Sequence, residues 1–280
     1  YYFQNKENKK VKWEEDKVYV DALYQGYLDA CRTFKWEKDG KDNKEYIREI
    51  FEEKEIVGDM KNYLRADKLE SFDEIHKKIC VNLIEKCKER TNMTYGQAQK
   101  IINMAFKYLY CCKHDSAMEE RFKACHMPLD SFSLEWFKRK FKEKNFSNLD
   151  SYSENNKELP ENLFTKKGEK KLKAESIGSW SSMQTWEEDC KKQEYPYEFY
   201  AHVIKQYCKE NSITPLQLDF IVWSKMQKIM AAESFIKTFK DDDEENKEVI
   251  NSEELEPYDI LNLKTTLENR LSEIRPLICK

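Results

Sequence analysis

Apolar side chains recur every three to four residues along most of this 280-residue chain, the spacing of one helix face. The pattern predicts helices over 13–34, near 46–51, and over 71–90, 97–112, 132–141, 186–211, 215–239 and 257–274. Only six glycines and six prolines are present, whereas turn-rich β folds depend on both. We therefore expect an all-α, multi-helix globular protein.

The segment 97–112 is apolar on almost every side, which is typical of a helix at the centre of a fold. Its polar exceptions are Lys100, Asn103 and Lys107, which fall within about 60° of one another on a helix and form one stripe. The stripe has two interpretations. It is either a solvent-facing edge of a core helix or the polar lining of a site.

Local sequence signals mark several helix starts. Ser71 and Glu74 match the S-x-x-E capping box, and Pro215 suits a first helical turn. Asp130 or Ser131 is the expected N-cap of the helix that begins at Phe132.

The division of the chain follows composition. Residues 1–239 are expected to form a helical core, with 142–178 as a polar, mobile loop or insertion. Residues 240–256 hold nine acidic residues against two lysines and read as an acidic linker, followed by a C-terminal helix in 257–280 that packs on the core. Outside the linker the charge is slightly positive, so the net charge of −4 does not exclude a polyanionic partner.

Nine cysteines are scattered through helical patterns, which favours free thiols in a reducing, cytoplasmic compartment. Three cysteines and two histidines lie close in sequence and raise a zinc alternative, although their spacing fits structural zinc sites poorly. These residues are Cys111, Cys112, His114, Cys125 and His126. We expect neither a metal nor a cofactor. We also expect no membrane-spanning helix, because no run of 18 apolar residues occurs.

Candidate chemistry concentrates in 94–131, where Lys100 and Asp130 lie 30 residues apart. A deprotonated lysine amine is a nucleophile, and a neighbouring carboxylate can move protons and stabilise a developing cation. An amine and a carboxylate are the pair needed for Schiff-base chemistry at a sugar carbon. Lys107 is a second candidate nucleophile on the same stripe.

This stretch, with Lys100 at the end of G-Q-A-Q-K and Asp130 within H-M-P-L-D-S, resembles the helix-hairpin-helix DNA glycosylase superfamily. It is most similar to the archaeal and bacterial 8-oxoguanine glycosylase/lyase branch. The resemblance implies a helix-hairpin-helix core over 71–112, with Lys100 as nucleophile and Asp130 as the catalytic aspartate. The usual glycine-rich hairpin is missing, and 91–96 stands in its place with a single glycine.

The resemblance implies a monomeric DNA-repair enzyme of a bacterial- or archaeal-type cytosol or nucleoid, acting on double-stranded DNA with a damaged base. Polar contacts to the base would come from Gln97, Gln99, Asn103 and His126. Candidate stacking rings, each with core packing as the alternative, are Phe132, Trp136, Trp180, Trp186, Phe220 and Trp223. Candidate contacts to the DNA backbone are Thr94, Tyr95, Gly96, Lys107, Lys138, Arg139 and Lys140.

A non-catalytic helical module that binds nucleic acid or protein is the alternative function. The two hypotheses differ in geometry. The enzyme requires the Lys100 amine within hydrogen-bond reach of Asp130, with both side chains facing an open cleft.

Overall fold

The computed structural model describes residues 12–37, 43–65, 71–146, 159, 161–166, 168–185 and 194–241. Within these ranges the chain is built from helices and loops, with isolated backbone bridges in place of strands. The α-helices are α1 Asp16–Ala30, α2 Asn43–Glu52, α3 Lys54–Arg65, α4 Phe72–Cys87, α5 Tyr95–Tyr110, α6 Ser116–Ala124, α7 Ser131–Phe141, α8 Tyr197–Glu210 and α9 Pro215–Asp241. The short 3₁₀ helices are η2 Cys31–Thr33, η4 Glu161–Leu163, η5 Ala174–Ser176 and η6 Trp180–Ser182. The all-α prediction is confirmed.

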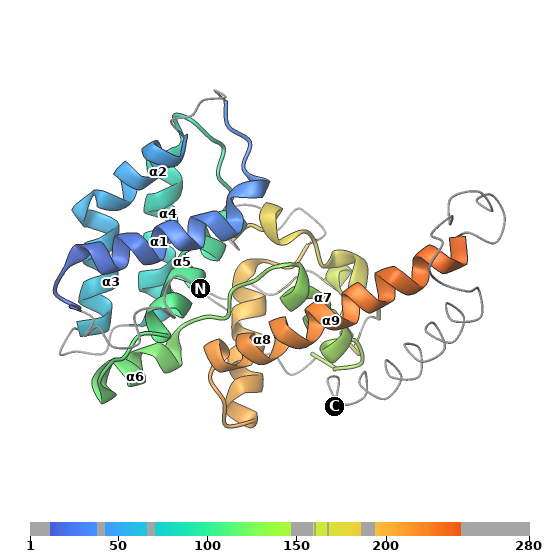
Figure 1. Cartoon of the computed structure of the whole chain (residues 1–280). Coiled ribbons are helices and arrows are strands. Elements are labelled where there is room, and N and C mark those ends of the chain that lie inside the picture. Colours follow the sequence, from blue (N-terminus) through green and yellow to red (C-terminus); the bar gives the residue numbers. More distant parts are fainter. Residues whose placement is uncertain are drawn as a thin grey trace, which may run out of the picture.

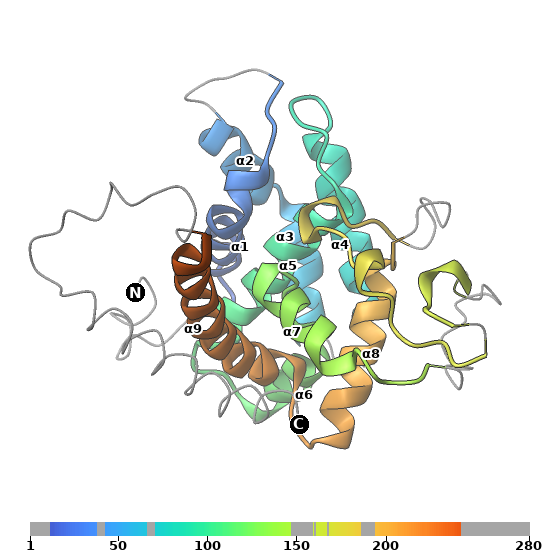
Figure 2. The same ribbon diagram turned by 90° about the vertical axis from the view of Figure 1, so that its right-hand side faces the viewer.

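Helix α5 lies in the middle of the molecule, as its all-round apolar pattern predicts (Figure 2). It packs along α1 and α4, and the close contact with α1 depends on Gly26. A Cβ atom at Gly26 would lie 2.4 Å from the carbonyl oxygen of Ile101, so a larger residue would push the two helices apart.

The remaining helices surround α5 on two sides. Helices α1 to α4 gather at one end of the ribbon and α7 to α9 at the other, and the second half of α9 extends well beyond the body (Figure 1). Loops between consecutive helices are short in the first half, whereas a long connection joins α7 to α8.

Two helices were not predicted. Helix α3 follows α2 after the single residue Glu53, where the pattern predicts one helix near 46–51. Helix α6 forms in 113–125, which we expected to be a polar connection. In α6, Asp115 accepts a hydrogen bond from the Met118 backbone N–H, and Met118 and Phe122 are buried. One cap and a narrow apolar stripe are enough for a helix that is stabilised by packing.

The described parts of 142–178 hold no α-helix, in agreement with the predicted loop. They are nevertheless anchored to the body. The rings of Phe146 and Phe164 are buried against Phe199 and Tyr195, respectively. Helix α8 begins at Tyr197 and the residues 194–196 before it are not helical, so the predicted start at 186 is wrong. Trp186, residues 1–11, most of 240–256 and all of 257–280 lie outside the described residues.

No helix in the described part of the chain is long and apolar enough to cross a membrane. Every cysteine placed within it is a free thiol, as expected.

Candidate functional site

Lys100 and Asp130 meet in a buried ion pair. Lys100 lies in the second turn of α5, and Asp130 is the N-cap of α7. The Lys100 Nζ donates to Asp130 Oδ2 at 2.8 Å, and the two side chains are only 7% and 10% exposed. Asp130 Oδ1 accepts from the backbone N–H groups of Phe132 at 3.0 Å and Ser133 at 2.9 Å. One carboxylate thus caps a helix and pairs with the candidate nucleophile.

Burial alone would raise the pKa of Asp130, since it disfavours the charged form. The charge and hydrogen bond of Lys100, together with the two backbone N–H groups, outweigh burial and hold the pKa below its usual value. Asp130 is therefore a carboxylate at neutral pH.

The polar stripe of α5 faces the interior, so its interpretation as a solvent edge is wrong. Asn103 is fully buried and donates to Tyr197 Oη of α8 at 3.0 Å. Lys107 forms an ion pair with Asp219 of α9, and its Nζ lies 4.5 Å from the centre of the Phe220 ring. The stripe meets α7, α8 and α9 in turn, at Lys100, Asn103 and Lys107.

Gln99 and Asn103 position the loop that carries Asp130. The Gln99 amide donates to the Leu129 carbonyl at 3.0 Å and accepts from the Leu129 N–H at 3.3 Å. Asn103 Nδ2 donates to Gln99 Oε1 at 2.9 Å. Both side chains are buried, so in this conformation they support the fold and do not contact a DNA base, contrary to the prediction.

His126 has hydrogen-bond partners within the protein on both ring nitrogens. Its Nε2 lies 2.6 Å from Asp73 Oδ1, and its Nδ1 lies 2.8 Å from Tyr197 Oη. Because a carboxylate only accepts, Nε2 carries the proton and Nδ1 accepts from the tyrosine hydroxyl. The Lys205 Nζ donates to both carboxylate oxygens of Asp73, at 2.7 and 2.8 Å. With both nitrogens engaged and the ring buried, His126 has no free group for a base, contrary to the prediction.

The start of α5 is covered by the segment around η6. The Gly96 N–H donates to the Met183 carbonyl at 2.8 Å, and a Cβ at Gly96 would lie 1.8 Å from the Trp180 carbonyl oxygen. Thr94 and Gln97 form a reciprocal capping box, with N–H to side-chain oxygen distances of 3.0 and 3.1 Å. These amides are satisfied within the chain. The expected phosphate contacts at Thr94 and Gly96 therefore do not fit this conformation.

Neighbouring side chains close the same region. Tyr95 is buried, with its hydroxyl 3.3 Å from His76 Nδ1. The Gln97 amide donates to the Thr33 carbonyl at 2.8 Å. Trp180 is buried as well, so these three side chains serve packing rather than DNA contact.

The candidate stacking rings divide into a buried and an exposed group. Trp136 is buried against Phe141 and Tyr207 and presents no face to a base, which corrects its predicted role. Phe220 and Trp223 on α9 remain 41% and 40% exposed. The half-buried Phe132, two residues after Asp130, contacts Trp223 edge to face. The two exposed rings thus lie on α9, which carries Asp219, and the half-buried Phe132 lies on α7, which Asp130 caps.

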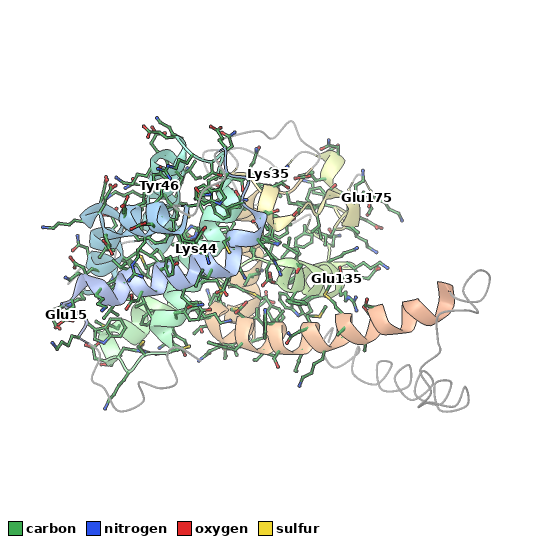
Figure 3. The ribbon with its side chains drawn as sticks, turned by 45° about the horizontal axis from the view of Figure 1, so that its top comes forward. Glu15, Lys35, Lys44, Tyr46, Glu135 and Glu175 are labelled. Carbon is green, nitrogen blue, oxygen red and sulfur yellow. The ribbon has the colours of Figure 1, made fainter. Side chains whose placement is uncertain are left out.

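The predicted basic surface of α7 is partly neutralised. Arg139 pairs with Glu135 of its own helix and, through two hydrogen bonds of 2.9 and 2.8 Å, with Glu233 of α9. Glu135 lies on α7 beside the long α9 (Figure 3). The Lys140 Nζ lies over the Tyr207 ring, and Lys138 is half-buried. Arg139 is therefore an interhelical tie here and not a free phosphate contact.

Asp219, Asp73 and Tyr197 are polar members of these networks that sequence reasoning missed. Asp219 could have been found from the sequence, because it falls at helical spacing with the apolar residues Val222 and Met226 on the buried face of α9. An acidic residue on an apolar face requires a partner.

The zinc alternative fails within the described residues, because they contain no group of three or more His, Cys, Asp or Glu side chains able to hold a metal ion. His114 instead contacts Glu119 at 2.6 Å. No protein-family model, curated protein or solved structure matches this chain.

Proposed function

We propose that this protein is a DNA glycosylase/AP lyase that excises an oxidised or modified base, with 8-oxoguanine as the favoured substrate. The observation that carries the proposal is the 2.8 Å contact between Lys100 Nζ and Asp130 Oδ2, two residues 30 positions apart. The fold brings together the amine and carboxylate that Schiff-base chemistry requires, and the sugar as target is what the resemblance in 94–131 implies.

The reaction begins with a proton transfer. Lys100 passes a proton to Asp130, and the neutral amine attacks C1′ of the damaged nucleotide. The C1′–N9 bond breaks, and its electron pair leaves with the purine. The adduct loses a proton and the sugar ring opens to a Schiff base, from which β-elimination releases the 3′ phosphate.

The enzyme hypothesis also required the pair to face an open cleft, and this part is wrong for the present conformation, because Lys100 and Asp130 are almost fully covered. A nucleotide flipped out of the duplex must displace side chains along α7 and α9 before its C1′ atom can reach the Lys100 amine. The exposed rings of Phe220 and Trp223 offer stacking surfaces on that side.

A second candidate function is a non-catalytic helical module that binds nucleic acid or protein. Two observations favour it. The N–H groups of Thr94, Gly96 and Gln97 are bonded within the chain, and Arg139 is paired with Glu233. In this alternative the Lys100–Asp130 pair serves only to tie α7 to α5.

Borohydride trapping on a duplex with one 8-oxoguanine separates the two functions. The decisive variant is Lys100→Arg, which keeps the positive charge beside Asp130 but has no primary amine to form a Schiff base. Lys107→Arg tests the second lysine of the α5 stripe, and Lys78→Arg, at an exposed position paired with Asp59, controls for surface amines.

We expect a covalent adduct with wild type, Lys107→Arg and Lys78→Arg, and none with Lys100→Arg. Loss with Lys107→Arg alone would move the nucleophile to Lys107. Absence of adduct and base release from 8-oxoguanine, abasic and other lesion duplexes would leave the binding module.

A further inference from the structure

Large apolar side chains are exposed together on one side of α9. Phe220, Ile221 and Trp223 are 41%, 46% and 40% exposed, and the described residues hold only one other large apolar side chain this exposed, Val81 of α4. Ser224, also exposed, falls between Phe220 and Ile221 around the helix axis. We call residues 220, 221, 223 and 224 the outer face of α9. Single exposed apolar residues are ordinary, whereas a group of them marks a contact surface.

Helix α9 is also long for the support that the described elements give it. Helices α6, α7 and α8 pack against it, yet the second half of its 27 residues extends well beyond the body of the molecule (Figure 1). Helices draw most of their stability from packing, since isolated ones are marginal in water. An element packed along the outer side of α9 would both cover the outer face and support the extended half.

The exposed charges beside the outer face are positive. Among residues 217–231 the exposed charged side chains are Lys225 and Lys228, whereas Asp219 is buried in its pair with Lys107. A second copy that presented the same face would bring these lysines toward their own equivalents, which disfavours self-association. The surface therefore suits an amphipathic element with acidic residues.

The chain that follows α9 has this composition and pattern. Residues 240–256 hold nine acidic residues against two lysines, and the apolar spacing predicts a helix over 257–274. The main apolar residues of that helix fall on a stripe only about 80° wide. They are Ile260, Leu263, Leu267, Leu271 and Ile274. So narrow a stripe is typical of a helix that packs along one neighbouring helix.

The chain between the two segments is long enough for this packing. Fifteen residues separate Asp241, the last residue of α9, from Pro257, and they span up to about 50 Å when extended. The helix from Asp241 back to Ile221 is only about 30 Å long. A tether of this kind gives the attached segment a millimolar effective concentration at α9, an advantage over any separate partner.

We propose that residues 257–274 form a helix that docks antiparallel on the outer face of α9. The direction follows from the tether, because the segment begins where α9 ends. Residues 257–274 and 221–238 are equally long, so the docked helix brings Leu271 and Ile274 onto the outer face. The docking does not rest on the glycosylase function. In the proposed enzyme, the segment must leave before Phe220 or Trp223 can stack on a base.

Photocross-linking in the whole 280-residue chain identifies what covers the outer face. Ile221→p-benzoylphenylalanine places an apolar probe there that forms a covalent bond to a contacting C–H group on irradiation. The same probe at Val81, exposed on α4, is the control. Isotopically heavy and light proteins are mixed before irradiation, so that peptide mass spectrometry separates links within one chain from links between copies.

We expect the probe in α9 to link to 267–280 of its own chain, and the probe in α4 not to. Leu267→Asp with Leu271→Asp should lower this yield at least about tenfold, because docking would strip water from two carboxylates. Asn269→Asp adds the same charge on the opposite side of the expected helix, and its yield should stay within about twofold.

Links between heavy and light chains would assign the outer face to a second copy and overturn the proposal. The absence of any link to 257–280, with links only to neighbours within the body, would show that the segment does not cover α9. An undiminished yield from Leu267→Asp with Leu271→Asp would show that the apolar stripe is not the contact. The linked peptide identifies the occupant even if that double variant fails to fold.

Discussion

At the residue scale, the contact between Lys100 and Asp130 that the enzyme hypothesis requires is confirmed, one residue lying on a central helix and the other at a helix start. The sequence was not sufficient to orient the polar stripe. Whether Asn103 and Lys107 face water or the interior depends on which elements cover α5, and α8 and α9 arrive from a hundred residues away. Burial costs less where a polar group finds a partner, as the Asn103 amide nitrogen does with Tyr197 and the Lys107 ammonium with Asp219.

Capping motifs in the sequence also do not show by themselves which caps form. The Ser71–Glu74 motif matches a capping box, yet the Ser71 side chain makes no cap hydrogen bond, so that prediction is wrong. The Thr94–Gln97 pair, T-Y-G-Q, forms the reciprocal box.

We predict that Thr94→Ala lowers the free energy of unfolding by about 1 kcal/mol, the usual cost of a lost N-cap. Its hydroxyl also donates to the Ser181 carbonyl at 2.6 Å, which adds to the loss. Ser71→Ala, the matched control, should change it by less than about 0.5 kcal/mol. Urea unfolding measures both, and an equal or larger effect of Ser71→Ala would contradict the capping assignment.

At the element scale, the long periodic helices were predicted and the short or covering elements were not. Helices α1, α4, α5, α7 and α9 follow from the hydrophobic period. Helix α6 and the cover of η6 over the start of α5 depend on long-range packing, which periodicity within one segment does not contain.

Alanine substitutions at two glycines, Gly96 beneath η6 and Gly58 at an open position of α3, should have opposite effects on stability. Gly96→Ala should destabilise the protein by several times RT, because its Cβ would overlap the Trp180 carbonyl and force η6 away. Gly58→Ala in α3 meets no atom within 4 Å and should stabilise by about 0.5–1 kcal/mol, as alanine favours helix interiors.

Thermal unfolding and hydrogen exchange over 179–185 measure these effects. A Gly96→Ala protein as stable as wild type, with unchanged protection of that segment, would show that η6 does not seal the helix start.

At the scale of the whole molecule, a polar network runs through the core beside α5. It links Asp73, His126, Tyr197 and Asn103, and His76 stacks on Tyr197 with ring centres 5.2 Å apart. The two histidines are buried, and burial lowers the pKa of both.

The network predicts a loss of stability in mild acid. Histidines of the unfolded chain bind protons near pH 6.5, whereas buried His76 and His126 resist protonation, so acid favours unfolding. The free energy of unfolding should change little between pH 7.5 and 7 and fall from about pH 6.5 to 5.5, by up to ~1.4 kcal/mol per pH unit for each histidine.

Urea titrations at pH 7.5, 6.5 and 5.5 check this, with His76→Gln expected to show a shallower slope. Stability that is unchanged or rises on acidification would mean that the two histidines are not held neutral by the fold.

The central claim is that Lys100 is the nucleophile of a Schiff-base enzyme, and the most direct measurement identifies the modified residue itself. The borohydride-reduced adduct of wild-type protein with an 8-oxoguanine duplex is digested and mapped by peptide mass spectrometry. The account predicts a sugar-derived mass on Lys100. A mass on another lysine, or no adduct at all, would contradict it.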